Sequence, residues 1–279
     1  MTQKSPSLLL LIPAYNEEAR IEPVLREYVE SFKTNYNGEC QFVVVLNGCV
    51  DNTIGVVKRV AETHPQVSWL EFPDPIGKGG ALIEGLKLAP LADLIGYVDA
   101  DGATSPKAFL DLVKLWDKAD CVIASRWLPG AVLHQQQTGK RQFASRVFHL
   151  IVQIAFRLNI KDTQCGAKVM RRQVVEKIHP LLRIADMAFD INLLYAIKRA
   201  GFKTLEVPTE WTDKIGSKVV LGRTSLTMLL SVIRLRLVHS PFYPVLKWLR
   251  PIETWIYLKL KAPPPRRPDK NPWDTDFKR

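Results

Sequence analysis

The chain has 279 residues, of which 47% are hydrophobic and 24% charged, and a formal net charge of +11. These proportions are those of a globular protein with a core, and they exclude a fibrous or fully disordered chain. The four cysteines fit no zinc or disulfide framework by their spacing, so we expect reduced core residues.

The positive charge invites nucleic acid, an anionic membrane or a phosphorylated small molecule as partner. No zinc-finger, helix-turn-helix or RNA-recognition pattern occurs, so nucleic acid is not expected. Much of the charge is local, since nine Lys and Arg residues stand against Glu253 and Asp269 between residues 234 and 270. The N-terminal apolar run is short and meets acidic residues at once, which predicts a strand rather than a signal peptide.

The first half of the chain alternates short apolar runs with helical patterns. Runs rich in Val, Ile and Leu predict strands buried on both faces, at 8–12, 42–46, 67–72, 94–98 and 121–124. Helical patterns lie between them, at 17–33, 51–64, 78–88 and 106–118. This alternation predicts an α/β fold with a mostly parallel, Rossmann-like sheet flanked by helices.

The second half is less regular. We expect helices at 142–158 and 189–200, and a loop with a short strand in "DTQCGAKVMRR". Residues 205–211 predict an edge strand, because Pro208 lacks a ladder donor. Residues 222–260 carry a helical pattern that mixes apolar and basic residues. We divide the chain into a main domain (1–221), an amphipathic helical segment (222–262) and a proline-rich charged tail (263–279).

Polar motifs follow four of the predicted strands: "PAYNEE", "NGCVDNT", "DPIGKGG" and "DADG". Ligands of parallel α/β sheets bind beyond the carboxyl ends of the strands. Four polar loops at one such edge therefore predict a single ligand site.

Asp99 and Asp101 of "DADG" are alternate residues at a strand end, so both carboxylates can point toward one region. Mg²⁺ uses one or two carboxylates and completes its shell with water and phosphate oxygens. The pair therefore predicts a metal that bridges to a diphosphate. The alternative is a pair of solvated loop acids that cap the helix beginning near Pro106.

Two further motifs have a structural as well as a functional interpretation. Asn47 can hydrogen-bond a nucleobase edge, and Asp51 can N-cap the helix that follows it. Lys78 lies among glycines at a predicted helix start, where backbone N–H groups favour anions. The alternative for this segment is a turn that glycine makes easy.

The motifs "LLIPAYNEEARI", "VVVLNGCVDNT", "GKGGAL", "YVDADG", "SRW", "DTQCGAKVMRR", "FDINLLYAIKRAGF" and "EVPTEW" occur in this order. Together they resemble the family-two glycosyltransferases of the GT-A fold. The chain is most similar to the branch of dolichyl-phosphate β-glucosyltransferases and dolichol-phosphate mannosyltransferases, over roughly residues 7–235.

The resemblance implies a donor site. The residues that match the family's nucleotide-sugar motifs are Pro13, Ala14, Tyr15, Glu17, Asn47, Asp51, Lys78 and Asp99. It also implies that Asp99 and Asp101 hold Mg²⁺ or Mn²⁺, which binds the donor diphosphate. The family's second loop usually begins with two acids, whereas Leu46 and Asn47 stand here, so the nucleotide preference stays open.

The implied reaction is inverting, metal-dependent transfer of a hexose from a nucleotide sugar, of the UDP-glucose or GDP-mannose type, to a polyprenyl or dolichyl phosphate. The metal stabilises the leaving charge as a Lewis acid, and the transition state is oxocarbenium-like. A phosphate acceptor is mostly dianionic at pH 7 and needs cations rather than a base. The cations expected to hold it are Arg126, Arg141, Arg146 and Lys168. A hydroxyl acceptor would need a base, for which Asp162 and Asp190 are the candidates.

Two rival functions remain open: transfer to a saccharide or other hydroxyl, and nucleotide-sugar binding without catalysis. Arg234 and Arg236 interrupt the C-terminal apolar pattern too early for a spanning helix. Aromatic residues beside cations there favour a membrane interface, and a helical cap on the core is the alternative. We therefore expect a cytoplasmic enzyme, without signal peptide or transmembrane helix, that binds the cytoplasmic membrane face peripherally.

Overall fold

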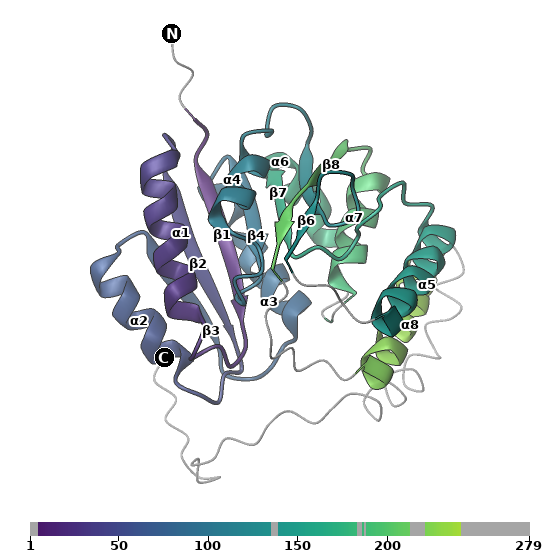
Figure 1. Ribbon diagram of the computed structural model, residues 1–279, viewed down its shortest axis with the longest axis horizontal. Coiled ribbons are helices and arrows are strands. Elements are labelled where there is room, and N and C mark those ends of the chain that lie inside the picture. Colours follow the sequence, from purple (N-terminus) through teal and green to yellow (C-terminus); the bar gives the residue numbers. More distant parts are fainter. Residues whose placement is uncertain (1–4, 135–138, 183–185, 187, 213–220, 241–279) are drawn as a thin grey trace.

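The computed structural model describes residues 5–134, 139–182, 186, 188–212 and 221–240, with side chains omitted at 139–144 and 221–226. A seven-stranded sheet forms the centre of the protein and carries helices on both faces (Figure 1). Its strands are β1 (Leu8–Ala14), β2 (Cys40–Asn47), β3 (Val67–Phe72), β4 (Leu94–Val98), β5 (Cys121–Ser125), β7 (Ala167–Arg171) and β8 (Thr204–Pro208).

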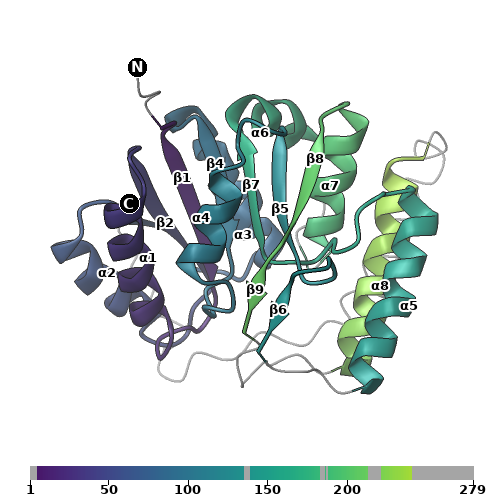
Figure 2. The same ribbon diagram turned by 45° about the horizontal axis from the view of Figure 1, so that its top comes forward.

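The strand order is β3-β2-β1-β4-β7-β5-β8. Strands β1 to β4 pair in parallel, with Leu8 opposite both Cys40 and Leu94. Strand β7 runs antiparallel between β4 and β5, and β8 pairs in parallel with β5. A small second sheet joins β6 (Val132–Leu133) to β9 (Glu210–Trp211), as Figure 2 shows below β5 and β8. All of the first four strands therefore end at one edge.

Side chains of the sheet alternate between two cores. In β1, Leu8, Leu10 and Ile12 join one cluster and Leu9 and Leu11 join the other, all at most 1% exposed. Complete burial of one such side chain contributes about 1.5–3 kcal/mol. Because both faces of each central strand are buried, its sequence is a continuous apolar run.

The helices divide between the two clusters. The first contains residues of α1 (Ile21–Asn35), α2 (Thr53–Thr63) and α4 (Pro106–Val113). The second contains residues of α3 (Lys78–Gly85), α5 (Gly139–Phe156), α6 (Arg172–Ile178), α7 (Phe189–Arg199) and α8 (Leu221–Val238). Short 3₁₀ turns follow α3 at Leu86–Leu91 and α6 at His179–Leu181.

The predicted α/β fold with a mostly parallel sheet is confirmed, and the five predicted strands lie where expected. Several details differ: helix α1 begins at Ile21 rather than at residue 17, and the short strand β6 was not predicted. Helix α4 ends at Val113, helix α6 was not predicted, and the predicted strand 205–211 is two strands separated at Thr209. The segments 241–262 and 263–279 lie outside the described residues. No helix in the described ranges is both long and apolar enough to cross a membrane.

Candidate active site

Hydrogen bonds join the loop after β1 to the loop after β2. The Glu17 N–H donates to Thr53 Oγ1 at 2.8 Å, and the Val50 N–H donates to Asn16 Oδ1 at 2.8 Å. The Asn52 N–H donates to a Glu18 carboxylate oxygen at 3.0 Å. The first two polar motifs of the sequence therefore form one connected surface at the sheet edge.

Asp51 lies at the start of α2, although the N-cap position belongs to Asn52. The Asp51 carboxylate accepts from the Thr53 N–H at 3.1 Å and from the Glu18 N–H at 3.2 Å. The predicted N-cap is thus shifted by one residue, because Asp51 satisfies the helix start from outside the cap and also binds the first loop.

The residues predicted to hold the nucleoside lie around the end of β1. Ala14 is buried, whereas Pro13, Tyr15 and Glu17 are partly exposed. Glu17 forms a two-pronged pair with Arg20, with both N–O distances at 2.7 Å. Partial burial, aided by Cys49 and Asp51, raises the pKa of Tyr15. Their contact with a nucleoside stays a prediction.

Asn47 links the second loop to the third. Its Oδ1 accepts from the Ile76 N–H at 2.7 Å, and the residue is 5% exposed. A nucleobase contact through this oxygen would share it with Ile76, so that role stays a prediction. Gly48 beside it has φ +63°, and a Cβ there would lie 2.5 Å from the Pro75 nitrogen, so only glycine fits.

Lys78 links the third loop to the fourth. Its Nζ lies 2.6 Å from Asp99 Oδ1, and the two side chains are 21% and 27% exposed. Burial alone would lower the pKa of Lys78, but the charges of Asp99, Asp190 and Asp101 outweigh burial and raise it. The ammonium therefore neutralises the first acid of the pair while it stays accessible to ligands.

Unlike Asp99, Asp101 is not paired directly with the Lys78 ammonium. Burial and the neighbouring Asp99 raise its pKa, against the Ala103 N–H, Lys78 and Arg20, which lower it. The Ala103 N–H donates to Asp101 Oδ1 at 2.9 Å. A carboxylate in this state gains from a nearby cation, because a positive charge removes the repulsion from Asp99.

The donor set of this corner fits Mg²⁺ or Mn²⁺ bound with a diphosphate. Hard cations take carboxylate oxygens, and two carboxylates suffice when phosphate and water supply the remaining ligands. No group of three or more His, Cys, Asp or Glu residues forms a metal cage within the described part of the chain. Asp99 and Asp101 are therefore the residues that would hold such an ion, in company with its substrate.

Beneath this corner lies a buried charge cluster. Lys168 Nζ lies 2.5 Å from Asp190 Oδ1 and donates to the Cys165 carbonyl at 2.6 Å, and Tyr97 also donates to Asp190. Lys168 is 0% exposed. This fully buried ammonium is an internal counter-ion for Asp190. Its contact with an acceptor phosphate stays a prediction.

Asp190 is 4% exposed, so burial would raise its pKa. The charges of Lys168 and Lys78, with the hydrogen bonds from Lys168 and Tyr97, instead hold that pKa below its ordinary value. Asp190 is thus a stabilised carboxylate and a weak base in this arrangement.

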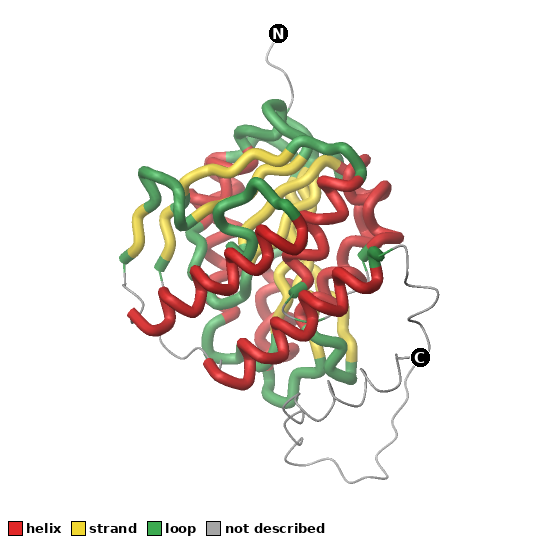
Figure 3. The backbone as a smooth tube through the Cα atoms, turned by 90° about the vertical axis from the view of Figure 1, so that its right-hand side faces the viewer, coloured by secondary structure: helices red, strands yellow, loops and turns green. Residues whose placement is uncertain are grey.

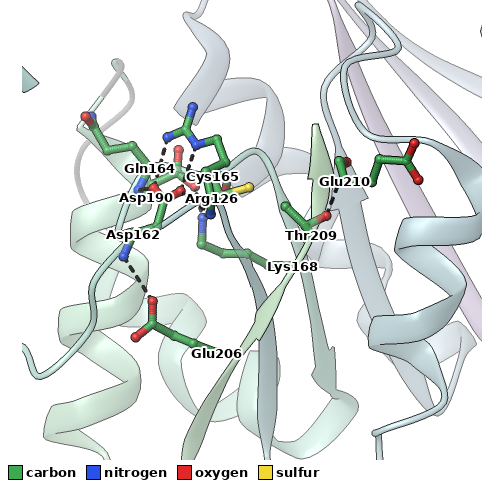
Figure 4. A network of polar contacts seen from close by, with 9 residues as sticks. All are labelled: Arg126, Asp162, Gln164, Cys165, Lys168, Asp190, Glu206, Thr209 and Glu210. Carbon is green, nitrogen blue, oxygen red and sulfur yellow. Dashed lines mark hydrogen bonds and ion pairs between the residues drawn. The ribbon is translucent and has the colours of Figure 1, made fainter. Parts of the chain in front are cut away.

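Arg126 and Asp162 form a second internal pair, drawn in Figure 4. Arg126 donates through Nε at 2.7 Å, through a terminal nitrogen at 2.9 Å and through its backbone N–H at 3.0 Å. Burial opposes ionisation, but these bonds from Arg126 lower the pKa of Asp162. The guanidinium also lies 5.0 Å from the Trp211 ring. Arg126 is therefore held rigidly, with 19% of its side chain exposed.

The other two predicted acceptor cations lie on α5. Arg146 is exposed, and the side chain of Arg141 lies outside the described residues. Ser145 and His149 of the same helix line a small pocket with Arg126 and Asp162. Arg126 and Arg146 thus come from neighbouring elements, and their binding of a phosphate stays a prediction.

Three residues that shape the site were not predicted. Thr53 joins the first two loops, Tyr97 binds Asp190, and Gly166 packs against Asp99. Tyr97 lies within an apolar strand pattern, which gives no sign of a polar contact. Gly166 lies within the motif "DTQCGAKVMRR", and nothing in its spacing shows which carboxylate it contacts.

Residues 10–179 match the family described as Glycosyl transferase family 2. The chain belongs to this family. It is 34% identical over 222 residues to a dolichyl-phosphate beta-glucosyltransferase, ALG5C, of Trichomonas vaginalis, covering 76% of this chain and 66% of the relative. It is 31% identical to dolichyl-phosphate beta-glucosyltransferase of Dictyostelium discoideum, covering 82% and 73%. The chain thus spans about two thirds of the first relative's length, and the predicted family-two resemblance is confirmed.

Solved structures confirm the fold. Glucosyl-3-phosphoglycerate synthase of Mycobacterium tuberculosis, crystallised with Mn²⁺, UDP and glucosyl-3-phosphoglycerate, superposes with a TM-score of 0.61 at 18% identity, covering 82% of this chain and 80% of that chain. The complex of that enzyme with Mn²⁺, UDP-glucose and phosphoglyceric acid gives 0.62 at 18% identity, covering 83% and 80%. This family-2 chain therefore has the GT-A fold that its motifs predicted.

Proposed function

We propose that this protein transfers a hexose from a nucleotide sugar to a polyprenyl phosphate, with inversion at the anomeric carbon and with a divalent metal at Asp99 and Asp101. One observation carries the choice of acceptor. Both candidate bases, Asp162 and Asp190, are ion-paired carboxylates whose pKa values lie below the ordinary range. An acceptor that needs no base, such as a phosphate dianion, fits such a site better than a hydroxyl does.

The bond changes balance without a proton transfer. An acceptor phosphate oxygen forms a bond to the anomeric carbon as the bond from that carbon to the donor diphosphate breaks. The electron pair leaves with the nucleoside diphosphate. A bound Mg²⁺ or Mn²⁺ supplies Lewis-acid stabilisation of this charge.

The chain's own residues then have separate tasks. Asp99 and Asp101 bind the cation, and Lys78, 2.6 Å from Asp99, adds a positive charge beside the departing diphosphate. Asp162 holds Arg126 in place through three hydrogen bonds. We propose that the acceptor phosphate binds to the exposed edge of the Arg126 guanidinium and to Arg146 of α5.

The relatives support the finer assignment. Two of them are named dolichyl-phosphate beta-glucosyltransferases, which favours glucose as the sugar and a dolichyl-type phosphate as acceptor. The fold neighbour crystallised with Mn²⁺ and UDP favours that metal and a uridine nucleotide. We also propose peripheral attachment to a membrane, because such an acceptor resides in one.

The test is a transfer assay with purified full-length protein, labelled UDP-glucose or GDP-mannose, and Mn²⁺ or a chelator. Three acceptors are compared: a polyprenyl phosphate, the matching polyprenol and a simple saccharide. We expect metal-dependent transfer to the phosphate alone. Transfer to the polyprenol or saccharide would establish a hydroxyl acceptor. Donor binding without turnover on any acceptor would establish a non-catalytic nucleotide-sugar-binding protein.

A further inference from the structure

Helices α5 and α8 lie side by side at one flank of the molecule in all three overall views (Figures 1, 2 and 3). Each helix packs inward through apolar residues: Val152 and Phe156 of α5, and Val232 and Leu235 of α8, are at most 3% exposed. This inward packing accounts for one face of each helix.

The outward faces are apolar as well. On α5, Val147, Leu150 and Ile154 are 43%, 59% and 71% exposed. Their spacing of three and four residues puts them on one stripe of the helix. On α8, Ile233 and Leu237 are one turn apart and 48% and 41% exposed. We call these five residues the α5–α8 face.

The charged residues of the two helices themselves have one sign. Neither α5 nor α8 contains an acidic residue, and each contains three basic ones. Arg146 and Arg236 are exposed beside the apolar stripes. An apolar stripe with a basic rim is the composition that binds an anionic lipid surface. A second copy of this chain, which also has a net charge of +11, would be repelled.

We propose that the α5–α8 face inserts into an anionic lipid surface and so brings the acceptor site to the membrane. This proposal rests on the proposed function, which supplies a lipid acceptor. The link to the site is α5 itself, because Ser145 and His149 line the pocket that contains Arg126. His149 also contacts Trp127, with ring centroids 4.9 Å apart.

The test uses full-length protein and sedimentation with vesicles of phosphatidylcholine alone or mixed equally with phosphatidylglycerol. Leu150→Asp with Ile154→Asp should lower the partition coefficient on the mixed vesicles at least about tenfold, because two charges replace inserted apolar groups. Leu91→Asp is the matched control, since Leu91 is 74% exposed on the 3₁₀ turn Leu86–Leu91. Arg236→Glu should weaken binding to the mixed vesicles in a salt-dependent way.

Unchanged vesicle binding in the double Asp variant, or an equal loss in Leu91→Asp, would overturn the proposal. Dissociation of a wild-type dimer by the double Asp variant, without an effect on vesicles, would assign the face to self-association instead. Transfer to a short, water-soluble prenyl phosphate separates this inference from the proposed function. The double Asp variant and Arg236→Glu should keep that transfer, whereas a failed proposed function would abolish it in wild-type protein as well.

A second, independent observation concerns Gly166. The antiparallel register that pairs Val98 with Ala167 places Gly166 opposite Asp99 when it is continued by one residue. A Cβ added at Gly166 would lie 2.1 Å from Asp99 Oδ2 and 2.5 Å from its Cγ. The carboxylate of Asp99 therefore rests on backbone that only glycine leaves bare.

We infer that Gly166 is a positioning residue for the metal-binding carboxylate of Asp99. Any side chain at position 166 must push that carboxylate out of its place. The first strand-end acid is thus oriented from both sides, by the Lys78 ammonium and by the Gly166 backbone.

The test measures Mn²⁺ affinity in the presence of nucleoside diphosphate, by calorimetry or by the electron paramagnetic resonance of free Mn²⁺. Gly166→Ala should raise the dissociation constant for Mn²⁺ at least about tenfold, with the effect on metal rather than on stability. The double variant Gly166→Ala/Asp99→Asn should bind Mn²⁺ no more weakly than Asp99→Asn alone, because the methyl group acts through Asp99. Additive losses, or wild-type affinity in Gly166→Ala, would contradict the inference. Thermal unfolding without metal checks that each variant is folded.

Discussion

The two sides of the candidate site handle charge differently. At the sheet edge that carries Lys78, Asp99 and Asp101, Lys78 and Asp99 are paired but remain 21% and 27% exposed. On the other side, Lys168 and Asp190 are paired at 0% and 5% side-chain exposure, and Asp162 is 3% exposed under Arg126. The first pair can exchange partners with a ligand, whereas the Lys168–Asp190 pair cannot do so without unfolding part of the protein.

This contrast separates charges that a ligand can reach from charges that stabilise the fold. Burial of an ion pair costs desolvation that the attraction repays only when geometry and hydrogen bonds are complete. Asp190 meets this condition through Lys168 and Tyr97. The more exposed carboxylates of Asp99 and Asp101 do not need complete internal pairing, because in the proposed function a substrate and a metal would neutralise their charge.

Loss of either strand-end acid should have the largest effect on function. Asp99→Asn or Asp101→Asn should lower the transfer rate about a thousandfold, since Lewis-acid stabilisation is worth several kcal/mol and each ~1.4 kcal/mol is tenfold in rate. The rate is measured at saturating donor and Mn²⁺. Asp111→Asn is the control, because Asp111 is half-exposed in a surface pair with Lys114. Near-normal rates in both strand-end variants would remove the metal from the proposal.

The buried cluster should respond in stability. Asp190→Asn leaves the Lys168 ammonium without its counter-charge and should lower the free energy of unfolding by about 3–5 kcal/mol, measured by urea denaturation. Tyr97→Phe, which removes one hydrogen bond only, should cost about 1 kcal/mol. Adding Lys168→Met to Asp190→Asn should recover part of the loss. A loss below that of Tyr97→Phe would contradict the assignment of Lys168 as an internal counter-ion.

Loss of the Arg126–Asp162 pair should lower stability less than loss of the Lys168–Asp190 pair, and the effect should depend on pH. Arg126 holds the pKa of Asp162 below its unfolded value of about 3.9, so the stabilisation is present above that pH and is lost as pH falls through the folded pKa. Asp162→Asn should therefore cost about 2 kcal/mol at pH 7 and progressively less below pH ~4. Urea denaturation across this pH range measures the difference.

The matched control for this pH dependence is Asp117→Asn, since Asp117 is exposed beside Lys118. This variant should differ little from the wild type at any pH. A difference for Asp162→Asn that stays constant between pH 7 and pH 3 would show that the carboxylate is not stabilised by Arg126.

The sequence was sufficient for the first half of the fold because each buried strand there is a short apolar run ending in a polar loop. The sequence also predicted that Lys78, Asp99 and the second loop meet at one sheet edge, because they follow strands that pair in parallel. The position of β7 between β4 and β5 could not be predicted, since pairing partners leave no mark on a five-residue strand that contains a lysine. The burial of Lys168 was missed for the same reason, because its counter-charge comes from a helix 22 residues away in sequence.

The first half of the chain resembles a separate unit, but its strand β4 pairs with β7 of the second half, which runs antiparallel to it. Because β7 covers β4 on the side away from β1, a fragment ending before residue 165 would leave β4 as a bare sheet edge. Its five residues, Leu94–Val98, are all apolar or aromatic apart from Gly96, and such an edge promotes aggregation. We therefore expect the first half to aggregate when it is expressed alone, so a split of the chain would have to be made elsewhere.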